Sequence, residues 1–182
     1  MKRIYATETT LAEAKAAAEA ATAPSMELDL LVAKALGQAP DTAQPDSQDP
    51  EGLGVEWTTP GFEAGMAEAR KEPDRDARRA ARNRVWDRGE AQGIAHPVSH
   101  SPNDALQLLP EFGENGDDWC VSITRMPPRR GGWRVRAERE SCGSAYEAES
   151  GPEDPNGALA ILRVALAARV DVKAAREGAE AY

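Results

Sequence analysis

Apolar residues recur at the three- and four-residue spacing of an amphipathic helix in two well-defined stretches of the chain. The first begins after the capping residue Ser25 and ends at Gly37, a residue type that is common just beyond helix ends. The second begins with Asp154 as cap and Pro155 in the first turn, and its broad apolar face predicts burial against a sheet. The apolar faces consist of Leu28, Leu31, Val32, Ala35 and Leu36, and of Ala158, Leu159, Ile161, Leu162, Ala165, Leu166 and Val170.

Three short runs in the second half of the chain alternate apolar and polar residues with the period of a β-strand. They cover residues 119–124, 133–138 and 143–149, and short turns separate them. This arrangement predicts an antiparallel meander. The residues that share one face within each run are Trp119, Val121 and Ile123, then Trp133, Val135 and Ala137, then Ser144, Tyr146 and Ala148.

Two further helices have weaker signals. Residues 9–21 place one leucine and several alanines on a single stripe, so we expect a helix, capped by Thr7 or Thr9, that buries little area. Ser101 and Pro102 form a strong helix start, because serine caps and proline suits the first position. The apolar stripe of this second helix is Ala105, Leu106, Leu109 and Phe112.

The region between the first amphipathic helix and Ser101 is more polar. Residues 38–54 combine four acids with three prolines, which predicts a linker or long loop, and residues 55–57 form a short extended piece. Residues 61–89 have a helical pattern that Pro73 interrupts. Its later half carries six arginines against three aspartates and few apolar residues, so we expect a helix that lies on the surface or projects from it.

Together these patterns predict an α+β fold in which helices and a small antiparallel sheet form helix–sheet–helix layers, with a helical insertion. The length of 182 residues suits one domain of ordinary size. We expect a helical arm at residues 1–24, a layered domain at residues 25–172 that residues 38–97 interrupt, and a charged tail at residues 173–182.

The composition narrows the classes of partner. The formal net charge is −9, which argues against nonspecific binding of nucleic acid or of an anionic membrane. No run approaches about 18 apolar residues, and the amino terminus lacks the apolar core of a signal peptide. We therefore expect a cytoplasmic protein in which Cys120 and Cys142 are ordinary buried thiols.

Three segments follow one another in a recognisable order: the leucine- and alanine-rich helix Glu27–Gly37, the capped start His100–Ala105 and the alanine-rich helix Gly157–Leu166. With the tryptophan-containing strands before the last helix, they resemble the phage ABA-sandwich family of small phage and prophage proteins. The resemblance covers about residues 25–172, apart from the insertion at residues 38–97. It implies helix–sheet–helix layering, a phage origin and hence the cytoplasm of a host bacterium, and it supplies no catalytic residues.

A dense group of arginines surrounds the turn at residues 127–132, next to a tryptophan. Guanidinium groups match phosphate oxygens and an indole stacks on a base, so these residues are a candidate nucleotide site. The alternative is a solvated strand face whose charge Glu138 and Glu140 balance, which is the usual finding for charge on an exposed strand. The candidate ligand-binding residues are Arg125, Arg129, Arg130, Trp133, Arg134 and Arg136.

The arginine-rich helix that follows Pro73 is a second candidate surface. Its charge suits a nucleic acid or an acidic partner, but the interleaved aspartates and the negative total weigh against nucleic acid. A protein–protein contact or a solvated helix is therefore favoured. The candidate partner-binding residues are Arg75, Arg78, Arg79, Arg82 and Trp86.

Side chains that bind metals or perform catalysis are few. His96, His100, Cys120 and Cys142 lack the spacing of a structural zinc site, so we expect no metal and no cofactor. No nucleophile elbow or phosphate-binding loop occurs in the chain, and the sequence therefore predicts a protein that is not an enzyme.

These observations predict a phage accessory protein that acts by binding, with a host protein of a defence system as the leading partner. Three alternatives stay open. The first is sequestration of a small nucleotide signal by the arginine–tryptophan turn, which rests on analogy with similar layered folds, and the second is a nucleotide-degrading enzyme. The third is a structural role in the virion, against which the low aromatic content weighs. Alanine-rich helices also suit pairing of two or more copies of the chain.

Overall fold

The computed structural model describes residues 4–48, 54–110, 119–140 and 143–180, and of residues 47–48 and 175–180 it describes the backbone alone. This part of the chain contains six helices and two three-stranded antiparallel sheets, so the predicted α+β class is confirmed. The helices are α1 (Leu11–Ala20), α2 (Met26–Ala35), α3 (Phe62–Lys71), α4 (Arg75–Asp87), α5 (Pro102–Leu106) and α6 (Ala158–Glu180). The strands are β1 (Gln44–Gln48), β2 (Val55–Thr58), β3 (Gln92–Ala95), β4 (Trp119–Arg125), β5 (Trp133–Arg139) and β6 (Ser144–Glu149).

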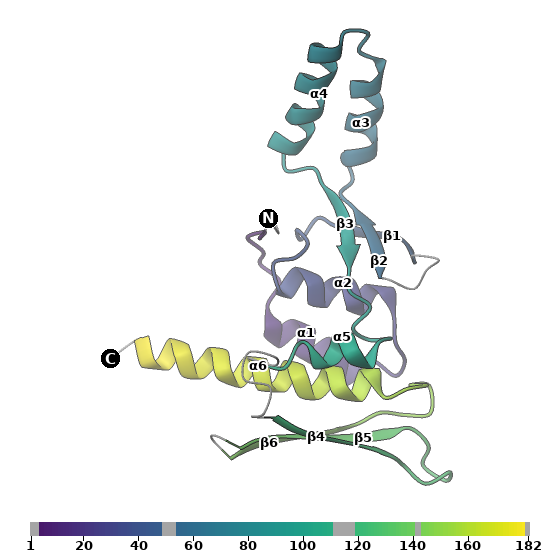
Figure 1. The fold of residues 1–182 in the computed structure, drawn as a ribbon, viewed down its shortest axis with the longest axis vertical. Helices are drawn as coiled ribbons and strands as arrows, with labels where there is room; N and C mark the ends of the chain where they lie inside the picture. The colour runs from purple at the N-terminus through teal and green to yellow at the C-terminus, as the bar shows by residue number, and fades with distance from the viewer. Residues whose placement is uncertain (1–3, 49–53, 111–118, 141–142, 181–182) are drawn as a thin grey trace.

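The predicted meander is confirmed as the sheet β4–β5–β6, in which neighbouring strands are antiparallel. One face of this sheet packs on α6, and the other points away from the helices (Figure 1). Along β5, Val135 and Ala137 are fully buried on the inner face, while Arg134 and Arg136 are exposed on the outer face. The period of two therefore produces one apolar and one charged face.

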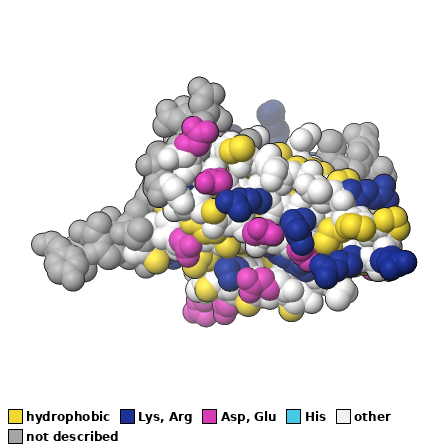
Figure 2. Space-filling view, turned by 90° about the horizontal axis from the view of Figure 1, so that it is seen from below, with side chains coloured by type: hydrophobic (Ala, Val, Ile, Leu, Met, Phe, Trp, Pro, Cys, Tyr) yellow, Lys and Arg dark blue, Asp and Glu magenta, His cyan; other side chains and the backbone are white. Residues whose placement is uncertain are grey.

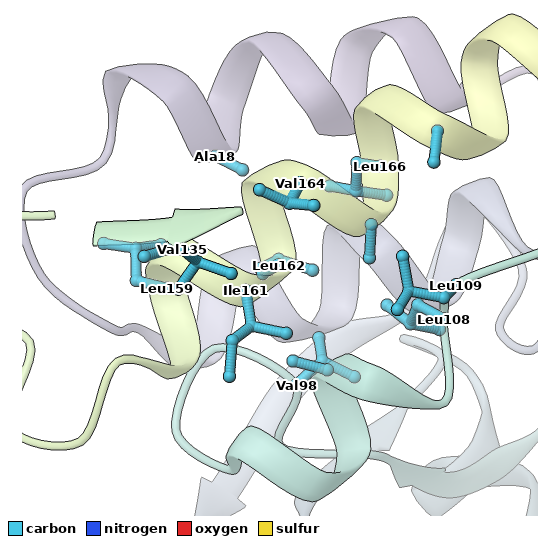
Figure 3. Close-up of a cluster of buried hydrophobic side chains, with 14 of the residues drawn as sticks. Ala18, Val98, Leu108, Leu109, Val135, Leu159, Ile161, Leu162, Val164 and Leu166 are labelled. Atoms are coloured by element: carbon cyan, nitrogen blue, oxygen red, sulfur yellow. The ribbon is translucent and has the colours of Figure 1, made fainter. Parts of the chain in front are cut away.

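Helix α6 forms the centre of the molecule, because nearly all its side chains between Ala158 and Ala168 are buried. The sheet covers one side of the helix, and α1 and α5 pack against others (Figure 1). Figure 3 shows Leu162 and Leu166 within the apolar cluster that also contains Val135 of β5. Since each large buried side chain stabilises the fold by about 1.5–3 kcal/mol, this cluster is the main core.

The two ends of α6 differ from the prediction. The carboxylate of Asp154 accepts the N–H of Gly157, before the helix, at 3.0 Å and that of Ala160, in the first turn, at 3.3 Å, but Asp154 does not occupy the N-cap position that the sequence predicted. The helix itself begins at Ala158, which leaves Pro155 before its first turn. At the other end, the helix continues to Glu180, through residues expected to form a charged tail, because alanine, lysine, arginine and glutamate are all strong helix formers.

Helix α1 packs in the main core instead of extending from it as an arm. Its cap is Thr10 rather than Thr7 or Thr9, and Thr10 forms a reciprocal capping box with the glutamate three residues later. Ala14 and Ala18 are fully buried against α6, because small side chains allow the two helices to approach closely. The alanine stripe of α1 is thus occupied within the chain.

The insertion at residues 38–97 contains a second sheet, of which the sequence predicted only the extended piece at residues 55–57, which is strand β2. Its antiparallel order is β1–β2–β3, and Val55 and Trp57 on one face pack in a second apolar cluster with α2. The sequence predicted a linker where β1 lies, because Gln-Pro-Asp-Ser-Gln has no apolar residue other than proline. Strand β3 also lacks a clear signal, because its one large apolar residue, Ile94, is exposed. The core helices therefore lie between two sheets (Figure 1).

Capping residues mark helix boundaries where the sequence predicted them. Ser25 caps α2 and Ser101 caps α5, and each side chain accepts the backbone N–H three residues later, at 3.2 and 3.3 Å. Gly37 ends α2 with a φ of 67°, a conformation that glycine adopts without strain. Phe112, expected on the stripe of α5, lies outside the described residues. Among the helices that the structure describes, none is both long enough and apolar enough to cross a membrane.

Candidate functional site

The helices α3 and α4 lie side by side and project from the sheet β1–β2–β3 as a helical hairpin, residues 62–87 (Figure 1). Strand β2 leads into this hairpin and β3 follows it, so two neighbouring strands form its base. The arginine-rich helix of the sequence analysis is α4, and its projecting position agrees with the prediction.

The turn of the helical hairpin is held by interactions with the backbone. The carboxylate of Asp74 accepts the N–H of Ala77 at 2.9 Å and caps α4. The guanidinium of Arg78 donates to the carbonyl oxygens of Glu72, at 3.0 Å, and Pro73, at 3.4 Å. Arg78 is half-buried, so this candidate partner-binding residue also stabilises the turn.

Apolar contacts hold the base of the helical hairpin. The rings of Phe62 and Trp86 meet edge to face with their centroids 5.3 Å apart, and Phe62 is buried. At Gly65 the two helices approach so closely that a Cβ atom would lie 2.8 Å from Cγ2 of Val85. Trp86 therefore holds α4 against α3, so it is, after Arg78, the second candidate partner-binding residue with a structural contact.

The three remaining candidates on α4 form one exposed surface. Arg75, Arg79 and Arg82 fall at positions i, i+4 and i+7, and all three are exposed. Within the described part of the chain, none of the three forms an ion pair with a carboxylate. We call these three residues the arginine face. Helix α4 carries five arginines against two aspartates, so it is a positively charged element of a chain whose net charge is −9.

The six candidate ligand-binding residues of the β4–β5 hairpin do not converge on one site. Successive side chains of a strand point to opposite faces of the sheet, and the turn lies beyond both faces. Arg129 and Arg130 are exposed at the turn. Arg134 and Arg136 lie on the outer face of the sheet, and Arg125 and Trp133 lie on the inner face.

A hollow of about 730 Å³ lies beside this turn, and its lining includes Arg125, Trp133, Pro127, Pro152 and Asp154. The guanidinium carbon of Arg125 lies 5.9 Å from the centre of the Trp133 ring, in a cation–π contact. The indole N–H of Trp133 donates to the carbonyl oxygen of Asp154 at 3.0 Å. Because one indole face and the N–H already have partners, a base that stacks there must displace Arg125.

Glutamates balance the arginines on the outer face of the β4–β5–β6 sheet. Nε of Arg134 lies 2.8 Å from a carboxylate oxygen of Glu149 and 3.4 Å from one of Glu147. The hydrogen bond with Glu149 raises the pKa of Arg134 above its ordinary value. Nη2 of Arg136 lies 3.2 Å from the carboxylate of Glu138. Figure 2 shows acidic and basic side chains interspersed over this face, as the solvated-face interpretation predicts.

A buried carboxylate that the sequence analysis did not single out lies in α2. Asp29 is fully buried and accepts the Ser99 N–H at 2.6 Å, and its second oxygen lies 2.9 Å from Nδ1 of His100. Burial raises the pKa of Asp29, and the hydrogen bonds from Ser99 and His100 oppose this shift. The Ser99 hydroxyl also accepts the N–H of Ser25 at 3.1 Å. This network fastens the start of α2 to the segment before α5.

The same residues do not have the geometry of a catalytic triad. Nδ1 of His100 lies 3.1 Å from Oγ of Ser99 and 2.9 Å from the carboxylate of Asp29, so both groups contact the same ring nitrogen. In a catalytic triad, the serine and the carboxylate contact opposite nitrogens of the histidine ring. The network is therefore structural.

Metal-binding side chains are dispersed. Nδ1 of His96 lies 3.5 Å from the carboxylate of Asp104, while His100 faces a different carboxylate. In the described ranges, no three histidine, cysteine or acidic side chains come together. Cys120 is exposed, which corrects the expectation of a buried thiol, because it points to the outer face of β4. Cys142 lies outside the described residues.

Two hollows that the sequence did not predict adjoin each other; residues of α2, α5 and α6 line the first, and residues of β2, β3 and α4 line the second. Their volumes are about 390 and 420 Å³, and Gln38 and His96 line both. The first has a mixed polar and apolar lining, and Tyr5, Trp57 and Trp86 line the second. No local motif reveals these hollows, because their walls come from segments that are far apart in the sequence.

Comparison with protein-family models, with curated proteins and with solved structures finds no match to the chain. The resemblance to the phage ABA-sandwich family therefore stays a prediction from the three sequence segments. The geometry of the candidate sites carries the functional argument that follows.

Proposed function

We propose that the protein is a binding protein whose arginine face docks on an acidic surface of a partner protein. The observation that carries this proposal is the position of Arg75, Arg79 and Arg82: they are exposed, lack ion pairs among the described residues and lie on an element that projects from the fold (Figure 1). Guanidinium groups with these properties are available to carboxylates of another molecule.

The helical hairpin is a suitable support for such a contact. Its capped turn and its Phe62–Trp86 contact hold α4 in place, so the three guanidiniums are presented from one helix surface. A fixed surface loses less conformational entropy on binding than a mobile one. Complementary charge also speeds association with an acidic partner.

A protein partner is favoured over a nucleic acid. Asp76 and Asp87 lie among the arginines of α4, and the chain as a whole is acidic, so a long polyanion meets repulsion beyond the arginine face. We propose a host bacterial protein, bound in the host cytoplasm by a phage accessory protein, as the partner class. Nucleotide sequestration by the β4–β5 hairpin has weaker support, because its arginines are divided and Trp133 already has partners.

The test compares two charge reversals of equal size. In Arg79→Glu with Arg82→Glu, the arginine face is reversed, and in Arg129→Glu with Arg130→Glu, the same change is made at the β4–β5 turn. Tagged wild-type protein and both double variants are used to capture partners from a bacterial lysate treated with nuclease. Captured proteins are quantified by mass spectrometry.

We expect an acidic protein that the wild type and the turn variant capture equally, and that the α4 variant captures at least about tenfold less. All three proteins should have the same melting temperature, because the reversed residues are exposed. Equal capture by the α4 variant, or loss of capture in the turn variant alone, contradicts the proposal. Capture that depends on nucleic acid also contradicts it.

A further inference from the structure

We propose a ligand site that is separate from the arginine face: the hollow of about 420 Å³ beside β3 binds a neutral, planar nitrogen heterocycle of nucleobase size. We call it the aromatic hollow. Its volume lies within the range of known small-molecule sites, and its lining combines aromatic rings with a few polar groups, as such sites usually do. The residues that carry the argument are Tyr5, Gln38, Trp57, Trp86 and Gln92.

The aromatic walls suit a flat ligand. The rings of Tyr5 and Trp57 meet nearly at right angles, with centroids 6.1 Å apart, and Trp86 lines the same hollow from α4. Tyr5 and Trp86 are half-buried, while Ile94 at the rim is 56% exposed. Aromatic surface that is partly exposed in the free protein gains by covering another ring, and this gain favours stacking.

An unpaired donor gives the hollow a polar requirement. Trp57 is 3% exposed, and its indole N–H has no hydrogen-bond partner in the described part of the chain. This N–H lies beside Gly93, where a Cβ atom would be 3.2 Å from Nε1, and both residues line the hollow. A buried donor without a partner is costly, so a ligand acceptor at this wall relieves the penalty.

The other buried indoles show that this arrangement is unusual within the chain. Trp119 donates its N–H to the carbonyl oxygen of Pro110 at 2.9 Å, and Trp133 donates to Asp154 at 3.0 Å. Each of these tryptophans uses a nearby backbone oxygen. Trp57 thus differs from these two tryptophans in having a buried indole N–H without a partner among the described residues.

The charge around the hollow indicates a neutral ligand. Gln38 and Gln92 supply amide donors and acceptors that match the edge of a heterocycle. The adjoining hollow, which shares Gln38, contains two carboxyl groups, of Asp29 and Asp104, against the single guanidinium of Arg169. The Nε of Arg169 already donates to the backbone oxygen of Leu108. A phosphate group would therefore meet one imidazole, His96, which already faces the carboxylate of Asp104, and no lysine or arginine among the residues that line the aromatic hollow.

The test uses four probes, adenosine, guanosine, cytidine and uridine, and ligand-observed NMR by saturation transfer. We expect at least one nucleoside to bind with a Kd below about 1 mM, and its 5′-monophosphate to bind more weakly. Trp57→Phe removes the N–H together with the five-membered ring of the indole, so it should weaken binding at least about tenfold. Gln38→Ala at the rim should weaken binding without lowering the melting temperature.

The free proteins provide the matched control. Trp57→Phe and Trp119→Phe remove the same ring volume from buried sites, but only Trp119→Phe also loses a hydrogen bond, so it should lower the melting temperature more than Trp57→Phe does and leave nucleoside binding intact. The proposal is overturned if no nucleoside binds, if Trp57→Phe binds like the wild type, or if Trp57→Phe destabilises the free protein as Trp119→Phe does. The variant Arg79→Glu with Arg82→Glu should bind nucleoside normally, so failure here is distinct from failure of the partner proposal.

Discussion

The chain has two arginine-rich hairpins, one made by the helices α3 and α4 and one by the strands β4 and β5. In the sheet, Arg134 and Arg136 face glutamates on the same surface, and Arg125 covers an indole ring. On α4, Arg79 and Arg82 project from the fold without an ion pair among the described residues. The two hairpins have a similar local density of arginines, but they differ in whether the guanidinium groups already have partners within the chain.

The difference follows from secondary structure. A strand places its arginines beside glutamates of the same sheet face: Arg134 pairs with Glu147 and Glu149 on the neighbouring strand, and Arg136 pairs with Glu138 on its own strand. A projecting helix has one partner helix, and its outer side faces solvent. The same residue type therefore stabilises a sheet surface in one region and offers a docking surface in the other.

Phe62→Ala tests whether the helical hairpin is a separate element. Removing this buried ring should lower the stability of the hairpin by about 3–4 kcal/mol, because it leaves a cavity against Trp86. Hydrogen exchange should show faster exchange of α3 and α4 amides with β4–β6 unchanged. Equal loss of protection in both regions would show that the hairpin folds with the core.

Arg163→Ala tests a third use of arginine. Its guanidinium donates to the carbonyl oxygens of Ala18, at 2.8 Å, and Ala21, at 2.6 Å, and to that of Glu149. Because this fork joins the end of α1 to β6, its loss should cost about 2 kcal/mol in denaturant unfolding. Arg163→Lys keeps the charge but lacks the fork, so it should recover only part of the loss. Full recovery by lysine would contradict the role of geometry.

Asp29→Asn tests the buried hydrogen-bond network that joins α2 to the segment before α5. Burial raises the pKa of Asp29 above its ordinary value of 3.8, so its contribution to stability is complete below that value and declines as the pH rises through the raised pKa. Asparagine does not titrate and keeps an acceptor for the Ser99 N–H. The free energy of unfolding of the variant should therefore fall less than that of the wild type between acidic and neutral pH. Parallel pH profiles would contradict this assignment.

Arg134→Ala should have the smallest effect, because its ion pairs with Glu147 and Glu149 are exposed and solvent screens them. We expect no measurable change in the melting temperature at physiological salt. Glu149→Ala is the matched variant and should behave in the same way. A clear loss of stability in either variant would show that the outer face is a structural network.

The C-terminal part of the fold could be predicted from the sequence because its signals are local. Alternation defined β4–β6, and the apolar face of α6 indicated burial. Apart from β2, the second sheet could not be predicted, since β1 has no apolar residue other than proline and the apolar cluster between this sheet and α2 consists mainly of alanines around Trp57. Small side chains bury little area, so they leave a weak periodic signal.

The candidate sites also differ in how far the sequence could predict them. Composition located the arginines of α4 and predicted that this helix would lie on the surface or project. The separation of the β4–β5 arginines needed the register, and the aromatic hollow needed the approach of Tyr5 to Trp57 across the chain. Long-range contacts of this kind leave no pattern in a single sequence.

Photo-crosslinking measures directly which arginine-rich hairpin contacts the partner. A photoreactive amino acid is placed at position 79 of α4 in one protein and at position 129 of the β4–β5 turn in another, and each is irradiated in bacterial lysate. We predict a crosslink to one acidic protein from position 79 and none to that protein from position 129. A crosslink from position 129 alone would contradict the proposal that α4 is the docking surface.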